Sequence, residues 1–148
     1  MEAIVFIGIQ ASGKSTFYKE RLADTHVRIN LDMLKTRARE RILLAACFNA
    51  KQPFAVDNTN PTRAERAAYI QLAREHSFKI IGYFFQSRIE ECKQRNEIRP
   101  EASKIPLPGL LGTHARLELP RLNEGFDELY FVRMDTQGFV VEKWNDEV

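Results

Sequence analysis

Apolar residues along the chain gather in short runs rich in β-branched and aromatic side chains, and these runs alternate with longer stretches of helical periodicity. Runs of this length are typical of buried strands, and the stretches between them repeat apolar positions at the spacing of one helix face. The predicted strands are Ala3–Ile7, Val27–Ile29, Phe54–Val56, Phe78–Phe85 and Leu129–Met134, and the predicted helices cover residues 14–23, 32–50, 61–76 and 88–98. Because strands and helices alternate, the pattern predicts an α/β fold with a parallel sheet flanked by helices.

Polar residues at the ends of these elements predict where some of them begin. Asn60 is a candidate N-cap with Pro61 at the first helical position, and Ser87 with Glu90 has the spacing of a capping box. Residues 135–141 read as a turn followed by a short apolar run. They predict a C-terminal hairpin that adds an antiparallel edge strand to the sheet.

The stretch from residue 99 to residue 120 departs from this alternation. It contains Pro100, Pro106, Pro108 and Pro120, together with Gly109 and Gly112. Residues that break regular structure at this density argue against a long element. We expect a mobile segment with at most a short helix.

Length and composition narrow the class of protein. The 148 residues fit one domain, and the formal net charge of +2 lacks the basic excess of a sequence-independent nucleic-acid coat. Cys47 and Cys92 do not form a C-x-x-C pair, so no disulfide is predicted. The N-terminal apolar run Ile4–Ile7 is too short for a signal-peptide core or a membrane span. We therefore expect a cytoplasmic protein without a membrane partner.

Gly8–Ser15 read GIQASGKS, a complete G-x-x-x-x-G-K-S motif between a predicted strand and a predicted helix. This is the context of a phosphate-binding loop, in which the glycines let backbone amides face the phosphates. Lys14 would reach the β- and γ-phosphates, and the Ser15 hydroxyl would ligate Mg²⁺. The nucleotide-binding residues expected here are Gly8, Gln10, Ala11, Ser12, Gly13, Lys14, Ser15 and Thr16. The motif predicts binding of a nucleoside triphosphate with Mg²⁺.

Two aspartates follow predicted strands, at the edge where parallel sheets bind ligands. Asp32 follows the second strand and is interpreted as the base that takes a proton from an acceptor hydroxyl, or alternatively as a helix N-cap. Asp57 follows the third strand in the form of a Walker B element and is predicted to hold Mg²⁺ with Ser15, or alternatively to be a turn residue. The chain contains no [NT]-K-x-D guanine-selecting motif, so ATP is expected rather than GTP.

Basic residues form two further groups. Arg95 lies near the end of the predicted helix 88–98, and Arg99 follows it at the start of the proline-rich segment. An arginine here could close over the phosphates, or the helix could simply present a solvated face. Lys35 and Arg39 lie on one face of the predicted helix 32–50. They are candidates to bind acceptor phosphates, although a solvated basic face is the commoner explanation of such a run.

These motifs resemble the 5′-kinase domain of polynucleotide kinases over most of the chain. The resemblance is carried by Gly8–Phe17, Arg28–Asp32, Asp57–Pro61, Arg95–Arg99, Lys104–Pro106 and Pro120–Phe126. It implies a P-loop kinase fold in which residues 95–120 form a lid over the nucleotide. It also implies that Asp32 is the general base for a 5′-hydroxyl and that Arg99 contacts the phosphates of ATP.

Two positions depart from that family. Leu31 stands where the family usually has arginine. Lys35 stands where the phage type of polynucleotide kinase has an arginine for the acceptor phosphate. Lysine keeps the charge but loses the bidentate fork of arginine. We therefore hypothesise a kinase that transfers the γ-phosphoryl group of ATP to a hydroxyl, the 5′-OH of DNA or RNA. The alternatives are a kinase for a small metabolite or nucleotide sugar, and a non-catalytic ATP-binding switch.

Overall fold

The predicted strands form one twisted sheet in the computed structural model of the protein, which describes residues 1–146. The last two residues of the expected domain, 147–148, lie outside the described residues. The sheet has six strands in the order β2-β3-β1-β4-β5-β6. They are β1 (Glu2–Ile7), β2 (Val27–Ile29), β3 (Phe54–Val56), β4 (Lys79–Phe85), β5 (Glu128–Asp135) and β6 (Gly138–Lys143). The first five are parallel and β6 pairs antiparallel with β5, so the predicted sheet and its edge hairpin are confirmed.

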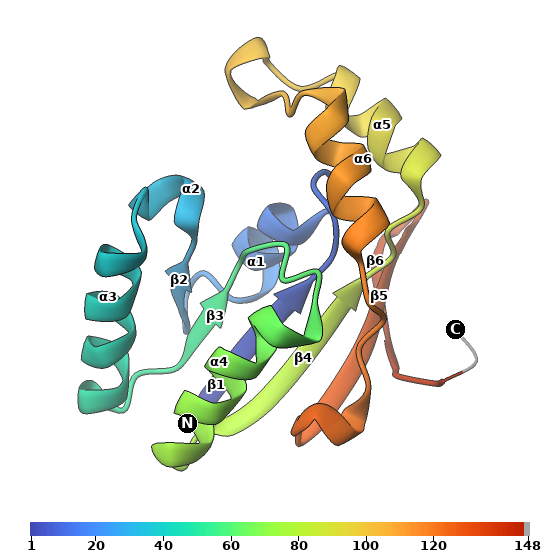
Figure 1. Cartoon of the computed structure of the whole chain (residues 1–148). Helices are drawn as coiled ribbons and strands as arrows, with labels where there is room; N and C mark the ends of the chain where they lie inside the picture. The colour runs from blue at the N-terminus through green and yellow to red at the C-terminus, as the bar shows by residue number, and fades with distance from the viewer. Residues whose placement is uncertain (147–148) are drawn as a thin grey trace.

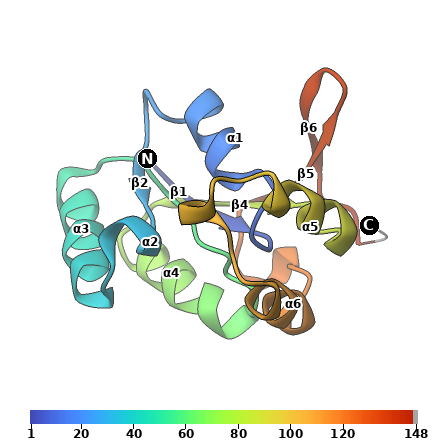
Figure 2. The same ribbon diagram turned by 90° about the horizontal axis from the view of Figure 1, so that it is seen from above.

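Helices cover both faces of this sheet (Figure 2). Helix α1 (Lys14–Arg21) lies on one face, and α3 (Arg37–Ala50) and α4 (Arg63–Glu75) lie on the other. The remaining elements are α2 (Leu31–Leu34), α5 (Ile89–Glu97), α6 (Leu107–Arg116) and the 3₁₀ turns η1 (Glu101–Ser103) and η2 (Leu122–Glu124). Helices α5 and α6 stand beyond the carboxyl ends of β1 and β4 (Figure 1). No helix in residues 1–146 is long and apolar enough to cross a membrane.

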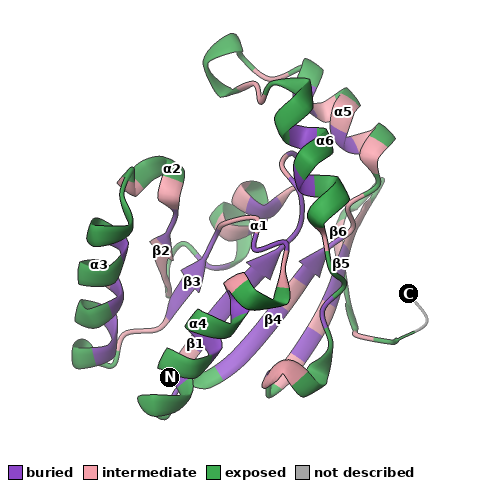
Figure 3. Cartoon of the chain, viewed as in Figure 1, coloured by how far each residue is buried: buried purple, intermediate pink, exposed green. Residues whose placement is uncertain are grey.

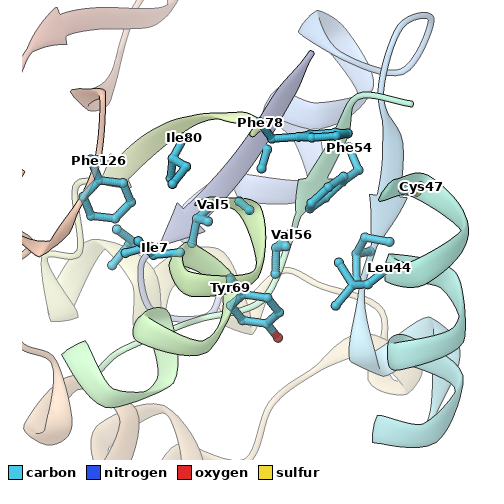
Figure 4. Packing of buried hydrophobic residues seen from close by; sticks show 14 of the residues in the cluster. Val5, Ile7, Leu44, Cys47, Phe54, Val56, Tyr69, Phe78, Ile80 and Phe126 are labelled. Atoms are coloured by element: carbon cyan, nitrogen blue, oxygen red, sulfur yellow. The ribbon is translucent and has the colours of Figure 1, made fainter. Parts of the chain in front are cut away.

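Alternation along β1 divides the core into two layers, because successive side chains of a strand point to opposite faces. Val5 and Ile7 belong to the apolar cluster beneath α3 and α4 (Figure 4). Ile4 and Phe6 belong to the cluster beneath α1, where the ring of Phe6 lies 5.9 Å from that of Phe17 in an edge-on arrangement. Figure 3 shows the central strands coloured as buried along most of their length. This sandwiching explains why the parallel strands read as continuous apolar runs in the sequence.

The helix predicted over residues 32–50 is instead two helices. Helix α2 ends at Leu34, and Lys35 has a φ of +74°, which a helix cannot accommodate. Thr36 then caps α3, since its hydroxyl accepts a hydrogen bond from the amide of Arg39 at 3.1 Å. The break makes α2 a short separate element, and its residues Leu31 and Asp32 line the same cavity as the phosphate loop.

The helices α4 and α5 begin within two residues of the predicted positions, but the capping residues predicted for both were wrong. Helix α4 begins after Thr62, which forms a capping box with Glu65. Asn60 has a φ of +45°, and its amide donates to the main-chain oxygen of Phe6 at 2.8 Å. Ser87 does not cap α5, because its hydroxyl donates to the oxygen of Phe85 at 2.8 Å. The structure uses these polar side chains to join loops to strand ends.

The proline-rich stretch contains a longer helix than expected. Helix α6 has ten residues, and its prolines stand at the N-cap and in the first turn, where a missing amide breaks no helical hydrogen bond. Leu110 is fully buried against Ile9 and Ala11 of the phosphate loop and Cys92 of α5. This small third cluster attaches the segment of residues 95–120 to the phosphate loop.

Candidate active site

The phosphate loop turns between β1 and α1 on two glycines that no other residue could replace without strain. Gly13 has a φ of +100° and forms the N-cap of α1. At Gly8, an added Cβ would lie 2.9 Å from the hydroxyl oxygen of Ser12. Ala11 and Ser12 are buried in the loop, whereas Thr16 is exposed in the first turn of α1. The predicted loop residues therefore do come together at the end of β1.

The Lys14 side chain is folded back onto this loop. Its ammonium group donates to the main-chain oxygens of Gly8 at 2.8 Å and Ile9 at 2.7 Å. Burial lowers the pKa of Lys14 to about 8. The ammonium is thus held at the loop by neutral carbonyl groups, which are weaker partners than phosphate oxygens.

The structure brings together the two residues predicted to hold Mg²⁺. The Ser15 hydroxyl donates to Oδ2 of Asp57 at 3.0 Å, and Asp57 is almost completely buried. A hydroxyl and a carboxylate are hard oxygen donors of the kind that Mg²⁺ prefers, with phosphates and water completing its coordination. No cluster of three or more potential metal-binding His, Cys, Asp or Glu side chains was found among residues 1–146.

Asp32 lies on α2, facing the same cleft. The N-cap of α2 is Asn30, whose Oδ1 accepts from the amide of Met33 at 2.9 Å, so the alternative assignment of Asp32 as the cap was wrong. The Asn30 side chain also donates to the main-chain oxygen of Asp57 at 2.6 Å. This pair of bonds fixes α2, and therefore Asp32, relative to the proposed metal ligand.

The cleft has a volume of about 270 Å³ and is open to solvent. Its walls are the phosphate loop with Lys14 and Ser15, residues 30–32, residues 57–59, and Arg99 with Ile105 from the proline-rich segment. Asp32, Lys14 and Arg99, which were predicted separately from three parts of the chain, therefore share one cavity. The arrangement can hold a polyphosphate beside a carboxylate that is free to accept a proton.

Arg95 lies at the contact between the phosphate loop and α5. It donates to the main-chain oxygen of Ala11 at 3.2 Å and also approaches Glu91 within 3.6 Å. The amide of Gln10 donates to the hydroxyl of Thr113 on α6 at 3.0 Å, while its oxygen is buried without a protein partner among the described residues. Helices α5 and α6 thus both touch the loop that would hold the nucleotide.

The cleft does not include the two basic residues predicted to bind the acceptor. Lys35 and Arg39 are exposed at the junction of α2 and α3, beyond Asp32, and Arg39 donates to the main-chain oxygen of Leu34 at 3.2 Å. They could be reached only by an acceptor that extends out of the cavity.

Sequence reasoning missed Arg28, which contacts both Ser15 and Asp57. The available signal was the alternation in β2, where Arg28 faces away from the side on which Ile29 is buried. It also missed Asn58, whose Oδ1 accepts from the amide of Leu31 at 3.0 Å. Its role depends on a tertiary contact that the local sequence does not reveal.

Residues 4–120 match the model of a protein family described as an AAA domain. The chain belongs to this family. It is 26% identical over 97% of its length to the bifunctional polynucleotide phosphatase/kinase of Schizosaccharomyces pombe, and it covers 36% of that protein. It is 30% identical over 86% of its length to a putative bifunctional polynucleotide phosphatase/kinase of Acanthamoeba polyphaga mimivirus, covering 32%. The similarity to polynucleotide kinase domains is confirmed, and the chain spans about a third of these relatives.

Solved structures show the same fold. Kti12 of Chaetomium thermophilum, in complex with ADP-AlF3, matches with a TM-score of 0.66 and 18% identity over 90% of this chain and 89% of that one. A gluconokinase of Sinorhizobium meliloti 1021 matches with a TM-score of 0.60 and 20% identity over 89% and 82%. The protein therefore has the fold of a P-loop kinase.

Proposed function

We propose that the chain is an ATP-dependent kinase that transfers the γ-phosphoryl group to a hydroxyl, with the 5′-OH end of DNA or RNA as acceptor. The observation that carries the proposal is the shared cleft, in which a buried phosphate-loop lysine, a hydroxyl–carboxylate pair and an exposed aspartate face one cavity. Phosphoryl transfer depends mainly on positioning and electrostatic stabilisation, and these are the groups it requires.

The phosphate loop binds the triphosphate. Lys14 exchanges its main-chain oxygen partners for phosphate oxygens, and its positive charge stabilises the charge that builds up during transfer. Arg99 also lines the cavity and contributes a second positive charge. Because both charges face the same cavity, both can act on a single γ-phosphoryl group.

Asp32 accepts the proton of the attacking hydroxyl. Its carboxylate is exposed in the cleft and is held on α2, whose position Asn30 and Asn58 fix. Ser15 and Asp57 are the residues that would hold Mg²⁺, which when bound neutralises charge on the β- and γ-phosphates. The base is thus tied to the metal ligand Asp57 through the N-cap of its own helix.

The choice of acceptor is supported by the relatives, which are named for activity on polynucleotides. The exposed cations Lys35 and Arg39 lie beyond Asp32, where the strand leading away from a 5′ end would pass. A small-molecule acceptor is the second candidate, favoured by Leu31, which gives the acceptor side of the cavity an apolar wall, and by the fold shared with a gluconokinase. A nucleotide switch without transferase activity is the third possibility.

The test is transfer of label from γ-labelled ATP in the presence of Mg²⁺ to matched oligonucleotides with 5′-OH or 5′-phosphate ends. We expect label only on the 5′-OH strand and none with Asp32→Ala, although this variant still binds ATP. Asp24→Ala, at an exposed aspartate between α1 and β2, is the matched control and should transfer label like the wild type. Full activity of Asp32→Ala would remove Asp32 as the base.

The same assay separates the alternatives. Absence of label on both strands, with ATP still bound, would contradict the polynucleotide acceptor, and gluconate and other small hydroxyl compounds would then be tested. A nucleic-acid kinase should also lose acceptor affinity as salt rises, whereas a metabolite kinase should be insensitive to competing oligonucleotide. ATP binding without transfer to any acceptor would support the switch.

A further inference from the structure

Arg28 closes a ring of hydrogen bonds with the two residues that would hold Mg²⁺. Its Nε donates to Oδ2 of Asp57 at 2.8 Å, and its Nη2 donates to the hydroxyl oxygen of Ser15 at 3.0 Å. Ser15 in turn donates to the same carboxylate oxygen of Asp57. A guanidinium group therefore interacts with both atoms to which a divalent cation would bind.

The fold holds Arg28 firmly in this position. It lies in the middle of β2, in register with Ala55 of β3, and its guanidinium carbon lies 6.0 Å from the ring centre of Tyr18 on α1. The Asp57 side chain is 1% exposed and that of Arg28 is 26% exposed, so water reaches the pair from one side only. Charge interactions in such a site are screened less than those on the surface.

The charges around this ring do not favour a free divalent cation. The guanidinium of Arg28 balances the carboxylate of Asp57. Lys14 and Arg99 then bring two positive charges to the cavity against the one negative charge of Asp32, so one positive charge is left in excess. A dication that approached Asp57 alone would meet net repulsion, because unit charges a few ångströms apart still interact strongly in a partly buried site. A triphosphate brings the missing negative charge, so the cation and the nucleotide fit the site together.

We propose that Arg28 is a positioning residue that acts as an internal counter-ion, keeping Ser15 and Asp57 paired in the nucleotide-free protein and making binding of the divalent cation depend on the nucleotide. This inference rests on the metal and nucleotide part of the proposed function and is independent of the acceptor. Arginine suits the task because its planar fork spans two acceptor oxygens and keeps its charge at any working pH.

Binding of Mn²⁺, used as a spectroscopic substitute for Mg²⁺, tests the inference. The electron paramagnetic resonance signal of free Mn²⁺ is followed during titration of the protein with and without a non-hydrolysable ATP analogue. The variants are Arg28→Gln, which removes the charge, Arg28→Lys, which restores it, and Arg133→Gln. Arg133 forms an exposed ion pair with Glu142 on the hairpin and is the matched control.

In the wild type, Mn²⁺ should bind weakly without nucleotide and much more tightly with it. Arg28→Gln should bind Mn²⁺ without nucleotide roughly tenfold more tightly than the wild type, because one repulsive charge is gone. The factor by which the nucleotide tightens Mn²⁺ binding should shrink accordingly. Arg133→Gln should behave like the wild type. Arg28→Lys keeps the charge but loses the fork, so its nucleotide-free Mn²⁺ affinity should stay close to that of the wild type. Adding Asp57→Asn to Arg28→Gln should abolish the gain in nucleotide-free Mn²⁺ affinity, which would show that the ion binds at this site.

Two results would overturn the inference. One is a wild-type protein that binds Mn²⁺ equally well with and without nucleotide, a measurement that needs no variant. The other is a folded Arg28→Gln protein, as judged by its melting curve, whose nucleotide-free Mn²⁺ affinity is unchanged or lower, since Arg28 would then only support Asp57. Both Mn²⁺ titrations test the inference even if the protein phosphorylates no acceptor. Failure to bind the nucleotide would instead count against the proposed function itself.

Discussion

Arg66 donates from Nη1 to the main-chain oxygen of Asn60 at 3.0 Å, from a side chain with no exposed surface. The same guanidinium pairs with Glu124 of η2, at 2.9 Å and 3.2 Å. Asn60 in turn donates to the end of β1 through its amide, and the amide of Gly8 donates to the oxygen of Thr59 at 3.0 Å. A buried ion pair between α4 and η2 thus supports the loop that lies against the phosphate loop.

Replacing Arg66 with alanine should therefore destabilise the protein strongly. The change leaves the Glu124 carboxylate, only 8% exposed, without its cationic partner, and loss of one member of a buried pair costs about 3–5 kcal/mol. Urea unfolding monitored by circular dichroism measures the loss. Arg133→Ala, which removes an exposed pair, should change the free energy of unfolding by no more than about 1 kcal/mol. Equal losses of unfolding free energy in the two variants would show that burial does not increase the contribution of the Arg66–Glu124 pair to stability.

Nucleotide affinity should fall as pH rises above about 8. The pKa of Lys14 is lowered to about 8 by burial, and bound phosphates raise it again because they stabilise the charged form. Below that value Lys14 is protonated in both states and contributes no pH dependence. Above it the free protein has lost the proton, so binding must take one up and the dissociation constant increases with pH. Calorimetry in buffers of different ionisation enthalpy at pH 7 and pH 9 measures this uptake, and Lys14→Met should abolish it.

Replacing Lys35 with glycine should affect two properties that can be measured separately, the backbone strain at this residue and the binding of the acceptor. Its φ of +74° suits glycine, so Lys35→Gly should leave the stability unchanged or raise it by up to about 1 kcal/mol. If Lys35 contacts the acceptor backbone, the KM for a 5′-OH oligonucleotide should rise, and the slope of log KM against log salt should fall by about one. Lys51→Gly is the control, because Lys51 also has a positive φ, +55°, but lies at the far end of α3. The same KM in both variants would place Lys35 outside the acceptor site.

The strands and the phosphate loop could be predicted because their signals are local. An apolar run such as Phe54–Val56 is recognisable without its neighbours, and the glycine-lysine motif itself specifies a strand-to-helix turn. The start of α4 was equally visible, since Thr62 and Glu65 have capping-box spacing, but Asn60 and Pro61 provided a competing signal. There the error lay in the choice between two local patterns.

Other features could not be predicted because they depend on distant contacts. The break at Lys35 lies between two helical stretches, and the only local sign of it is Thr36, a common N-cap residue, while α2 itself is tied to the loop after β3 by tertiary hydrogen bonds. Arg28 likewise gains its role from Asp57, which lies 29 residues further along the chain. The alternation in β2 indicates which way Arg28 faces, but a tertiary hydrogen bond of this kind leaves no sign in the sequence of which residue it will meet.

A buried network behind the cleft connects α3 and α4 to the loop that carries Asn58. The hydroxyl of Tyr69 donates to Glu40 at 2.9 Å and accepts from Arg37 at 2.9 Å and from the amide of Asn58 at 3.3 Å. Glu40 is 4% exposed. Burial, together with the Glu40 carboxylate, raises the pKa of Tyr69 to about 12, so the hydroxyl keeps its proton at any working pH. The phenol therefore remains a donor to Glu40 while it holds Asn58.

Tyr69→Phe should lower kcat without weakening ATP binding. Asn58 accepts from the amide of Leu31, so a looser Asn58 lets the adjacent Asp32 move relative to the acceptor hydroxyl. A displacement of about 1 Å in such a group can cost up to about 100-fold in rate. The unfolding free energy should also fall by about 1–3 kcal/mol, because Glu40 loses a buried donor. Tyr83→Phe, in the apolar layer beneath α1, is the control and should leave kcat unchanged. A folded Tyr69→Phe protein with wild-type kcat would mean that Asn30 alone holds α2 in place, since its amide is the other bond that joins this helix to the loop after β3.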